Sequence, residues 1–177
     1  ATAGIAYTAL RYELGKEFES LRAHGTAEIA SLYGSYPLIR SRNTNLSALL
    51  AFDAKTFKDE VDTAPPPGNV TDKKANVAMA SLVGNNRDGF GGGGLTTYAL
   101  TWSSGDIDIR TPVALAADAA TARTNGRFDK LGFNLARLQS VTERFSLYGA
   151  ISGQFASKNL DISEKMGLGG PYAVRAY

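Results

Sequence analysis

Apolar and polar residues alternate along most of the chain with a period of two. This pattern is typical of β-strands with one apolar face, because successive side chains of a strand point to opposite sides of the sheet. It predicts seven strands, of which the first two alternate least regularly. The predicted strands cover residues 4–14, 26–39, 45–61, 74–86, 95–107, 128–141 and 145–158. We therefore expect an all-β fold.

The two faces of the predicted strands differ in polarity. One face carries large apolar side chains, such as Leu50, Leu100 and Leu135. In the fourth strand the pattern assigns Val77, Met79 and Val83 to this apolar face, opposite Asn76, Ala78 and Ala80. The other face is small and polar, which suits a water-filled lumen better than a dry core. Its candidate lumen-facing residues are Ser47, Asp53, Lys55, Thr101, Asn134 and Gln154.

Short and long connectors alternate between the predicted strands. Residues 40–44, 87–94 and 142–144 are short connectors, whereas 15–25, 62–73 and 108–127 are long ones. Outer-membrane barrels have this arrangement, with short periplasmic turns and longer extracellular loops. Strands of about ten residues or more also exceed the length typical of soluble sheets. The pattern favours part of a transmembrane antiparallel β-barrel, although a soluble β-sandwich shares the two-residue period.

The composition removes several classes of chemistry. The 177 residues contain no cysteine, which excludes disulfides, cysteine-ligated zinc and cysteine nucleophiles. A single histidine, His24, cannot form a histidine metal cluster or supply a Ser-His-Asp triad, and we expect it to be exposed. The formal net charge of +2 is too small to indicate nucleic-acid binding. These counts exclude only the sites that need cysteine or several histidines.

Three local features have simple structural interpretations. The glycine-rich run 89–94 lacks the lysine and helix of a phosphate-binding loop, so we expect a strand turn with positive φ angles. Residues 111–124 are rich in alanine and predict a short surface helix. Carboxylates gather where strands enter long connectors, and we interpret them as a solvated rim rather than a catalytic pair or a calcium site. They are Asp59, Glu60, Asp62, Asp106 and Asp108.

The end of the chain has a motif of another kind. Residues 164–177 read EKMGLGGPYAVRAY, a glycine-rich segment that contains Gly169 and Gly170. Its ending, Val174-Arg175-Ala176-Tyr177, resembles the Val-Arg-Gly-Tyr motif of two-partner secretion transporters, the ShlB/FhaC/HecB haemolysin secretion/activation family, with Ala176 in the glycine position. Residues 36–42, 87–88 and 154–160 resemble other stretches of that family in the same order.

This resemblance implies a sixteen-stranded outer-membrane barrel, of which residues 1–177 would form strands five to eleven. The family's periplasmic domains and its later strands would then lie outside this sequence. Residues 159–177 would be an extracellular loop that folds into the barrel. Its functional motif would comprise Gly169, Gly170, Val174, Arg175, Ala176 and Tyr177, with Arg175 pairing to an acidic residue on one of the later strands.

The resemblance also implies partners. An integral outer-membrane transporter of this family contacts membrane lipid and exports a large unfolded exoprotein, such as a haemolysin, an adhesin or a contact-dependent toxin. It recognises that exoprotein through the exoprotein's N-terminal secretion domain. The resemblance implies no enzymatic activity, cofactor, metal or small-molecule substrate. The alternation alone also fits an assembly factor of the same superfamily, a passive porin, or a soluble β-sandwich binding module. A gene for a large exoprotein beside this locus would favour the transporter.

Overall fold

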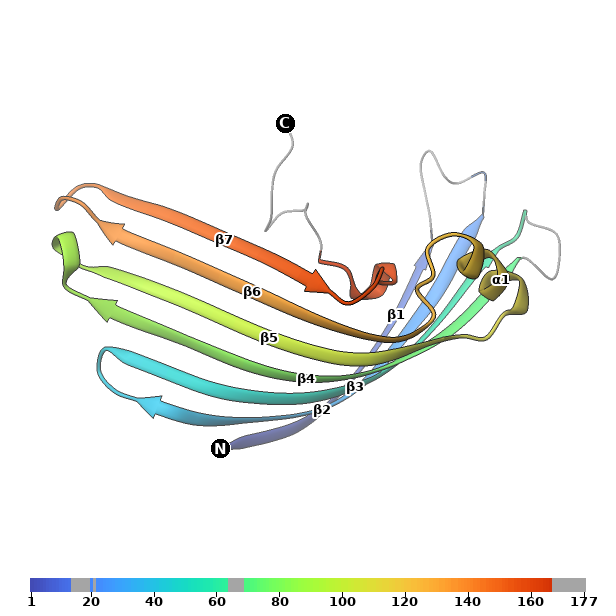
Figure 1. The fold of residues 1–177 in the computed structure, drawn as a ribbon, viewed down its shortest axis with the longest axis horizontal. Coiled ribbons are helices and arrows are strands. Elements are labelled where there is room, and N and C mark those ends of the chain that lie inside the picture. The colour runs from blue at the N-terminus through green and yellow to red at the C-terminus, as the bar shows by residue number, and fades with distance from the viewer. Residues whose placement is uncertain (14–19, 21, 64–68, 167–177) are drawn as a thin grey trace.

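The structure is a computed structural model that describes residues 1–13, 20, 22–63 and 69–166, and these residues form one antiparallel sheet. Seven strands of this described part follow one another in chain order. They are β1 (Thr2–Glu13), β2 (Ala23–Arg40), β3 (Thr44–Val61), β4 (Val70–Asp88), β5 (Gly94–Ile109), β6 (Gly126–Ser140) and β7 (Ser146–Ala156). The strands make a single, strongly curved layer with tight turns at one end and long connections at the other (Figure 1).

Each strand pairs with its sequence neighbour, and β1 and β7 form the two edges of the sheet. Among the described residues, no strand pairs with the free edge of β1 or of β7, so the curved sheet is open. A long, curved antiparallel meander is the architecture of part of a β-barrel wall. The predicted fold class is therefore confirmed.

All seven predicted strands are present, and their ends differ from the predicted ones by a few residues. β4 begins at Val70 and β2 at Ala23, earlier than their apolar patterns begin. Polar residues extend these strands because ladder hydrogen bonds join backbone groups and do not depend on side-chain polarity. β1 and β2 alternate weakly in sequence, yet they pair from Thr2 with Ser35 to Glu13 with His24.

The glycine-rich run forms the tight turn between β4 and β5. Phe90–Gly92 is a short 3-10 turn, η2. Gly91, Gly92 and Gly93 have φ angles of 58°, 97° and 98°, a region that side chains with a Cβ rarely adopt. The predicted strand turn with positive φ angles is confirmed.

The connection between β5 and β6 contains a helix, α1 (Pro112–Ala120), which confirms the predicted helix in a shorter form. Its first turn begins with Pro112, where a missing N–H costs no helix bond. After the helix, the Asp118 carboxylate accepts hydrogen bonds from the backbone N–H groups of Thr124 and Asn125, at 2.9 and 3.0 Å. These bonds direct the chain into β6. No helix in the described part of the chain is long and apolar enough to cross a membrane.

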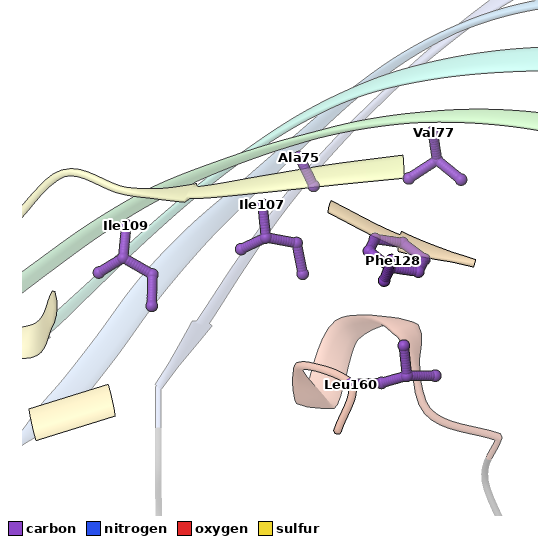
Figure 2. Packing of buried hydrophobic residues seen from close by; sticks show 6 residues of the cluster. All are labelled: Ala75, Val77, Ile107, Ile109, Phe128 and Leu160. Carbon is purple, nitrogen blue, oxygen red and sulfur yellow. The ribbon is translucent and has the colours of Figure 1, made fainter. Parts of the chain in front are cut away.

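A small hydrophobic core lies on the concave face, near the long connections. It consists of Ala75, Val77, Ile107, Ile109, Phe128 and Leu160 (Figure 2). Leu160 comes from the segment after β7, whereas the other five come from β4, β5 and β6. A Cβ at Gly105 would lie 2.7 Å from the Phe128 ring, so this glycine leaves the room that the ring occupies. The core thus joins the sheet to a segment folded over it.

The predicted faces of β4 are wrong. Val77 pairs with Asp53 and Val83 pairs with Ser47, so Val77, Met79 and Val83 lie on the polar, concave face of the sheet. The residues predicted to oppose them lie on the outer face: Asn76, Ala78 and Ala80. The segment after β7 covers the concave face here, and Val77 is completely buried. Burial under this segment favours apolar side chains at Val77 and Met79, whereas Val83 is 40% exposed and is not part of this core.

Candidate functional site

The chain turns onto the concave face of the sheet after β7 (Figure 1). We call residues 157–166 the return segment. The Ser157 N–H donates to the carbonyl of Asp129 at 2.9 Å, and Lys158 Nζ donates to the carbonyl of Asn125 at 2.6 Å. These bonds attach the start of the return segment to β6 and to the connection before it.

Glu164 is a buried charge within the return segment. Its side chain is 2% exposed, and its carboxylate contacts Lys55 Nζ of β3 at 2.7 Å and Lys130 Nζ of β6 at 2.6 Å. Lys130 Nζ also donates to the Glu164 carbonyl oxygen at 3.0 Å. A buried carboxylate requires such charge-assisted partners. Glu164 thereby joins the return segment to two strands that are not neighbours in the sheet.

Asp161 makes a second ion pair with the wall. Its two carboxylate oxygens lie 3.0 and 3.1 Å from Lys73 Nζ of β4. It also begins the 3-10 turn η3 (Ile162–Glu164), accepting hydrogen bonds from the Ser163 N–H at 3.0 Å and hydroxyl at 2.7 Å. Burial acts to raise the pKa of Asp161, but the hydrogen bonds from Ser163 and Lys73 outweigh it and hold this pKa below its ordinary value. Asp161 is therefore negatively charged at neutral pH.

We call Lys55, Lys73 and Lys130 the lysine cluster. Side chains of the sheet also contact these three lysines. Lys55 Nζ lies 3.8 Å from the Asp53 carboxylate, which in turn accepts a hydrogen bond from Ser31 at 2.7 Å. Lys73 Nζ lies 5.3 Å from the centre of the Phe57 ring, and Lys130 Nζ lies 5.9 Å from that of Phe128. The ring faces attract the ammonium groups. The wall thus positions all three cations through contacts of its own.

The six polar residues predicted to face a lumen all lie on the concave face: Ser47, Asp53, Lys55, Thr101, Asn134 and Gln154. The register aligns Ser47 with Asn134 across β4 and β5, and Thr101 with Gln154 across β6. Lys55 reaches the return segment directly.

Some residues of the site were not predicted from the sequence. They are the other two members of the lysine cluster, Lys73 and Lys130, and their partners Asp161 and Glu164. Two features of the sequence could have indicated these ion pairs. One is the pair of acidic residues three positions apart after the last strand, and the other is the presence of lysines at inward positions of separate strands.

The motif at the end of the chain lies outside the residues that the structure describes. It comprises Gly169, Gly170, Val174, Arg175, Ala176 and Tyr177. The described chain continues to Met166, two residues after Glu164. The motif therefore follows closely on a segment that the lysine cluster binds, and its own position stays a prediction.

A groove of about 1000 Å³ occupies the concave face toward the tight turns. Its polar lining comes mainly from small uncharged side chains, including Ser47, Asn85, Thr97, Asn134 and Ser152. No lysine, arginine, aspartate or glutamate of the described residues lines it. The concave wall is therefore divided into a charged part under the return segment and an uncharged part of mixed polarity beside it.

The outer face carries a continuous band of exposed apolar side chains. In cross-strand register, Leu50 and Trp102 flank Ala80, and Trp102 is followed by Leu131 and Phe155. The following large side chains of this band are between 37% and 68% exposed: Leu50, Phe52, Leu82, Leu100, Trp102, Leu131, Leu135, Ile151 and Phe155. An exposed apolar surface of this extent marks a contact with lipid or protein.

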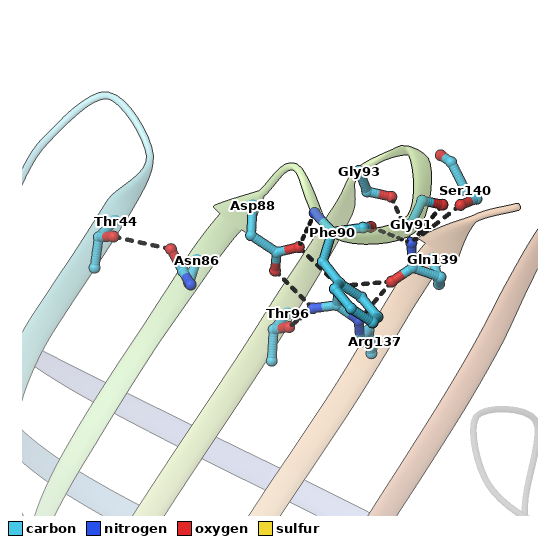
Figure 3. A network of polar contacts seen from close by, with 10 residues as sticks. All are labelled: Thr44, Asn86, Asp88, Phe90, Gly91, Gly93, Thr96, Arg137, Gln139 and Ser140. Atoms are coloured by element: carbon cyan, nitrogen blue, oxygen red, sulfur yellow. Dashed lines mark hydrogen bonds and ion pairs between the residues drawn. The ribbon is translucent and has the colours of Figure 1, made fainter.

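Polar side chains bound this band beside the tight turns (Figure 3). Arg137 of β6 donates to both carboxylate oxygens of Asp88, at 2.8 and 2.9 Å, and to the Thr96 hydroxyl at 2.7 Å. Gln139 Nε2 donates to the carbonyl of Phe90 in the glycine turn at 2.7 Å. This network joins the turn between β4 and β5 to β6. Asp88 therefore has a structural role, because it holds this turn in place.

The predicted carboxylate rim is only partly solvated. Tyr12 donates a hydrogen bond to Asp59. Side-chain ligand atoms of His24, Glu60 and Asp62 lie within 4.8 Å of one another, and Lys58 Nζ lies 3.9 Å from Glu60. His24 is exposed, as predicted. Lys58 already supplies a counter-charge to Glu60, and we assign no metal ion to His24, Glu60 and Asp62.

Comparisons with known proteins agree with the two-faced wall. The family model for the haemolysin secretion/activation protein ShlB/FhaC/HecB matches residues 2–177. The heme/hemopexin transporter protein HuxB of Haemophilus influenzae strain KW20/Rd is 27% identical over 177 residues, covering 98% of this chain and 30% of the relative. HuxB of strain 86-028NP is 28% identical over 180 residues with the same coverage.

The chain spans about 30% of the length of these curated relatives. No solved structure matches it. The match to the family model extends over almost all of the sequence, and it includes the meander, the return segment and the motif that follows. The chain belongs to the ShlB/FhaC/HecB haemolysin secretion/activation family.

Proposed function

We propose that the protein containing this chain exports a large unfolded exoprotein across a bacterial outer membrane by two-partner secretion. The observation that carries the proposal is the family match over residues 2–177. The exported partner would be a haemolysin, an adhesin, a contact-dependent toxin or, because HuxB is named a heme/hemopexin transporter, a protein that handles heme or hemopexin. The partner's N-terminal secretion domain would be the part recognised.

The two faces of the sheet suit this task. The outer apolar band would contact lipid, where its burial is favourable, and the concave face would line the pore. The groove on the concave face is uncharged, and its hydroxyl and amide groups stand among apolar side chains such as Leu49 and Val83. An unfolded polypeptide would find hydrogen-bond partners there but no fixed charge that binds it tightly. The geometry therefore supports transport rather than catalysis.

Residues 159–177 would form the loop that enters the pore. The return segment supports this proposal because its ion pairs direct the chain onto the concave face. Arg175 would anchor the far end of the loop by pairing with a carboxylate outside this sequence, with Val174 and Tyr177 packing around it. Gly169, Gly170 and Ala176 would allow the close backbone approach that such a loop needs.

Thiol labelling of the full-length protein in membranes tests the membrane topology. Single cysteines at Leu50, Leu100 and Leu135 should resist water-soluble thiol reagents, because lipid would cover these positions. Cysteines at the concave positions Ser47, Thr101 and Asn134 should react through the lumen. Leu100 and Thr101, and likewise Leu135 and Asn134, are neighbours in one strand with side chains on opposite faces. The two members of each of these pairs therefore lie at nearly the same depth and control for each other. The reverse labelling pattern would contradict the barrel orientation.

Co-expression tests the function itself. The full-length protein is produced in a Gram-negative host together with the large exoprotein encoded beside its gene. We expect the exoprotein to reach the medium only when both are present, and to remain in the periplasm when its N-terminal secretion domain is deleted. Equal export without the transporter would argue against the proposal. Export that does not depend on the secretion domain would argue against recognition of that domain by the transporter.

A further inference from the structure

The described part of the concave wall has a local excess of positive charge that the return segment neutralises. The lysine cluster contributes three positive charges, and Asp53 is the wall carboxylate that lies near it, 3.8 Å from Lys55. The return segment supplies the other two carboxylates, Asp161 and Glu164. The lysine side chains are only 12–18% exposed while the segment covers them. Unpaired, such cations would bind anions.

We propose that the lysine cluster is a binding site for acidic polypeptide segments, which the return segment occupies as an internal ligand. This inference rests on the proposed function, because the exported exoprotein is the polypeptide that would pass this wall. An acidic stretch of the exoprotein would compete with Asp161 and Glu164 for Lys55, Lys73 and Lys130.

The wall itself prepares the site for such a ligand. Asp53, Phe57 and Phe128 contact the three lysines from the sheet and not from the return segment. The long side chains are therefore directed to the concave face by neighbours that remain when the segment leaves. Preorganised cations lose less side-chain entropy when an anion binds.

The contacts of the internal ligand define what the site accepts. Lys73 binds one carboxylate, and Lys55 and Lys130 share a second one three residues further along the chain. Lys130 also binds the backbone carbonyl of Glu164, a contact that any polypeptide could make. The site therefore fits an unfolded segment with two acidic residues closely spaced in sequence. Hydroxyl groups or isolated carboxylates would satisfy only part of it.

Fluorescence anisotropy with a labelled oligoglutamate peptide and the detergent-solubilised full-length protein tests the site. In the wild type, the return segment should compete and keep the affinity low. The double variant Asp161→Asn/Glu164→Gln keeps the shape of both side chains and removes their charge. It should bind the peptide about tenfold more tightly, because the peptide no longer displaces charged competitors. Binding should weaken as salt is added.

Matched variants separate the site from general charge effects. Adding Lys55→Gln and Lys130→Gln to the double variant should abolish the gain, whereas Lys58→Gln, on an exposed lysine paired with Glu60, should preserve it. Oligolysine should show no gain. A folded barrel migrates differently from the heat-denatured protein in gel electrophoresis, and this shift reports whether each variant folds. If the double variant does not fold, the single variant Glu164→Gln takes its place.

Equal affinity of the wild type and of the folded charge-neutral variants would overturn the inference. A gain that persists after Lys55 and Lys130 are replaced would also overturn it. The proposed function is judged separately by secretion of the exoprotein. Loss of the peptide site with normal secretion would leave that function intact, and peptide binding without any secretion would contradict the function alone.

Discussion

Replacing Arg175 with alanine in the full-length protein is expected to abolish or sharply reduce secretion while the barrel still inserts. A charge-assisted hydrogen bond contributes about 2 kcal/mol, so its loss would shift the loop by a factor of about thirty away from its anchored state. The measurement compares exoprotein in the medium with heat-modifiable, membrane-inserted transporter. Arg144→Ala, at an exposed arginine of the turn between β6 and β7, is the matched control and should secrete normally.

A lysine at position 175 distinguishes the kind of contact. Arginine binds a carboxylate through two parallel N–H groups, and lysine cannot reproduce that geometry although it keeps the charge. Arg175→Lys should therefore restore secretion poorly. Normal secretion by Arg175→Ala would show that the motif does not anchor the loop, and full rescue by lysine would show that charge alone is sufficient.

The 177-residue chain expressed alone is expected neither to form a monomeric pore nor to stay soluble without detergent. The free edges of β1 and β7 present unpaired backbone groups among the described residues, and each such group costs several kcal/mol in hydrocarbon. In water the outer apolar band is exposed instead, and the free edges are templates for aggregation. Ultracentrifugation after expression, with and without detergent, measures the outcome.

Two outcomes would contradict this prediction. A soluble monomer with a sharp thermal unfolding transition would show that the chain buries its apolar face by itself, as a β-sandwich does. Unitary ion currents from a monomer would show that the sheet closes without further strands. Lysine substitutions in the outer band, such as Leu100→Lys and Ile151→Lys, provide a control, because they should increase solubility in water if the exposed band causes the aggregation.

The sequence predicted the strands because alternation is a local property of the backbone. Each side chain of a strand points opposite to its neighbours, so a polar lumen and an apolar surround leave a two-residue pattern in each strand that contacts both. That pattern alone places Ser47, Thr101 and Asn134 on the polar face, and the strand register confirms that they share one face. The glycine turn was also predictable, because a run of glycines between two strands permits the positive φ angles found at Gly91–Gly93.

The site depends on contacts that no local pattern encodes. Lys55 and Glu164 are 109 residues apart, and their ion pair exists because the chain turns back over β3 after β7. Neither residue has a sequence neighbour that indicates the other. Arg137 and Asp88 are likewise separated by 49 residues and meet through the pairing of intervening strands. For such pairs the sequence shows only that charges of both signs are available.

The faces of β4 show most clearly what only the tertiary structure decided. By itself, the sequence determined that the chain forms long strands with distinct faces, because that requires only the alternation of side chains along a backbone. It could not determine that Val77 and Met79 point to the concave side. That orientation is favourable because Leu160 and Phe128 complete an apolar cluster there. Which face of a strand is buried depends on what covers it, and the covering segment is brought to β4 only by the folded chain.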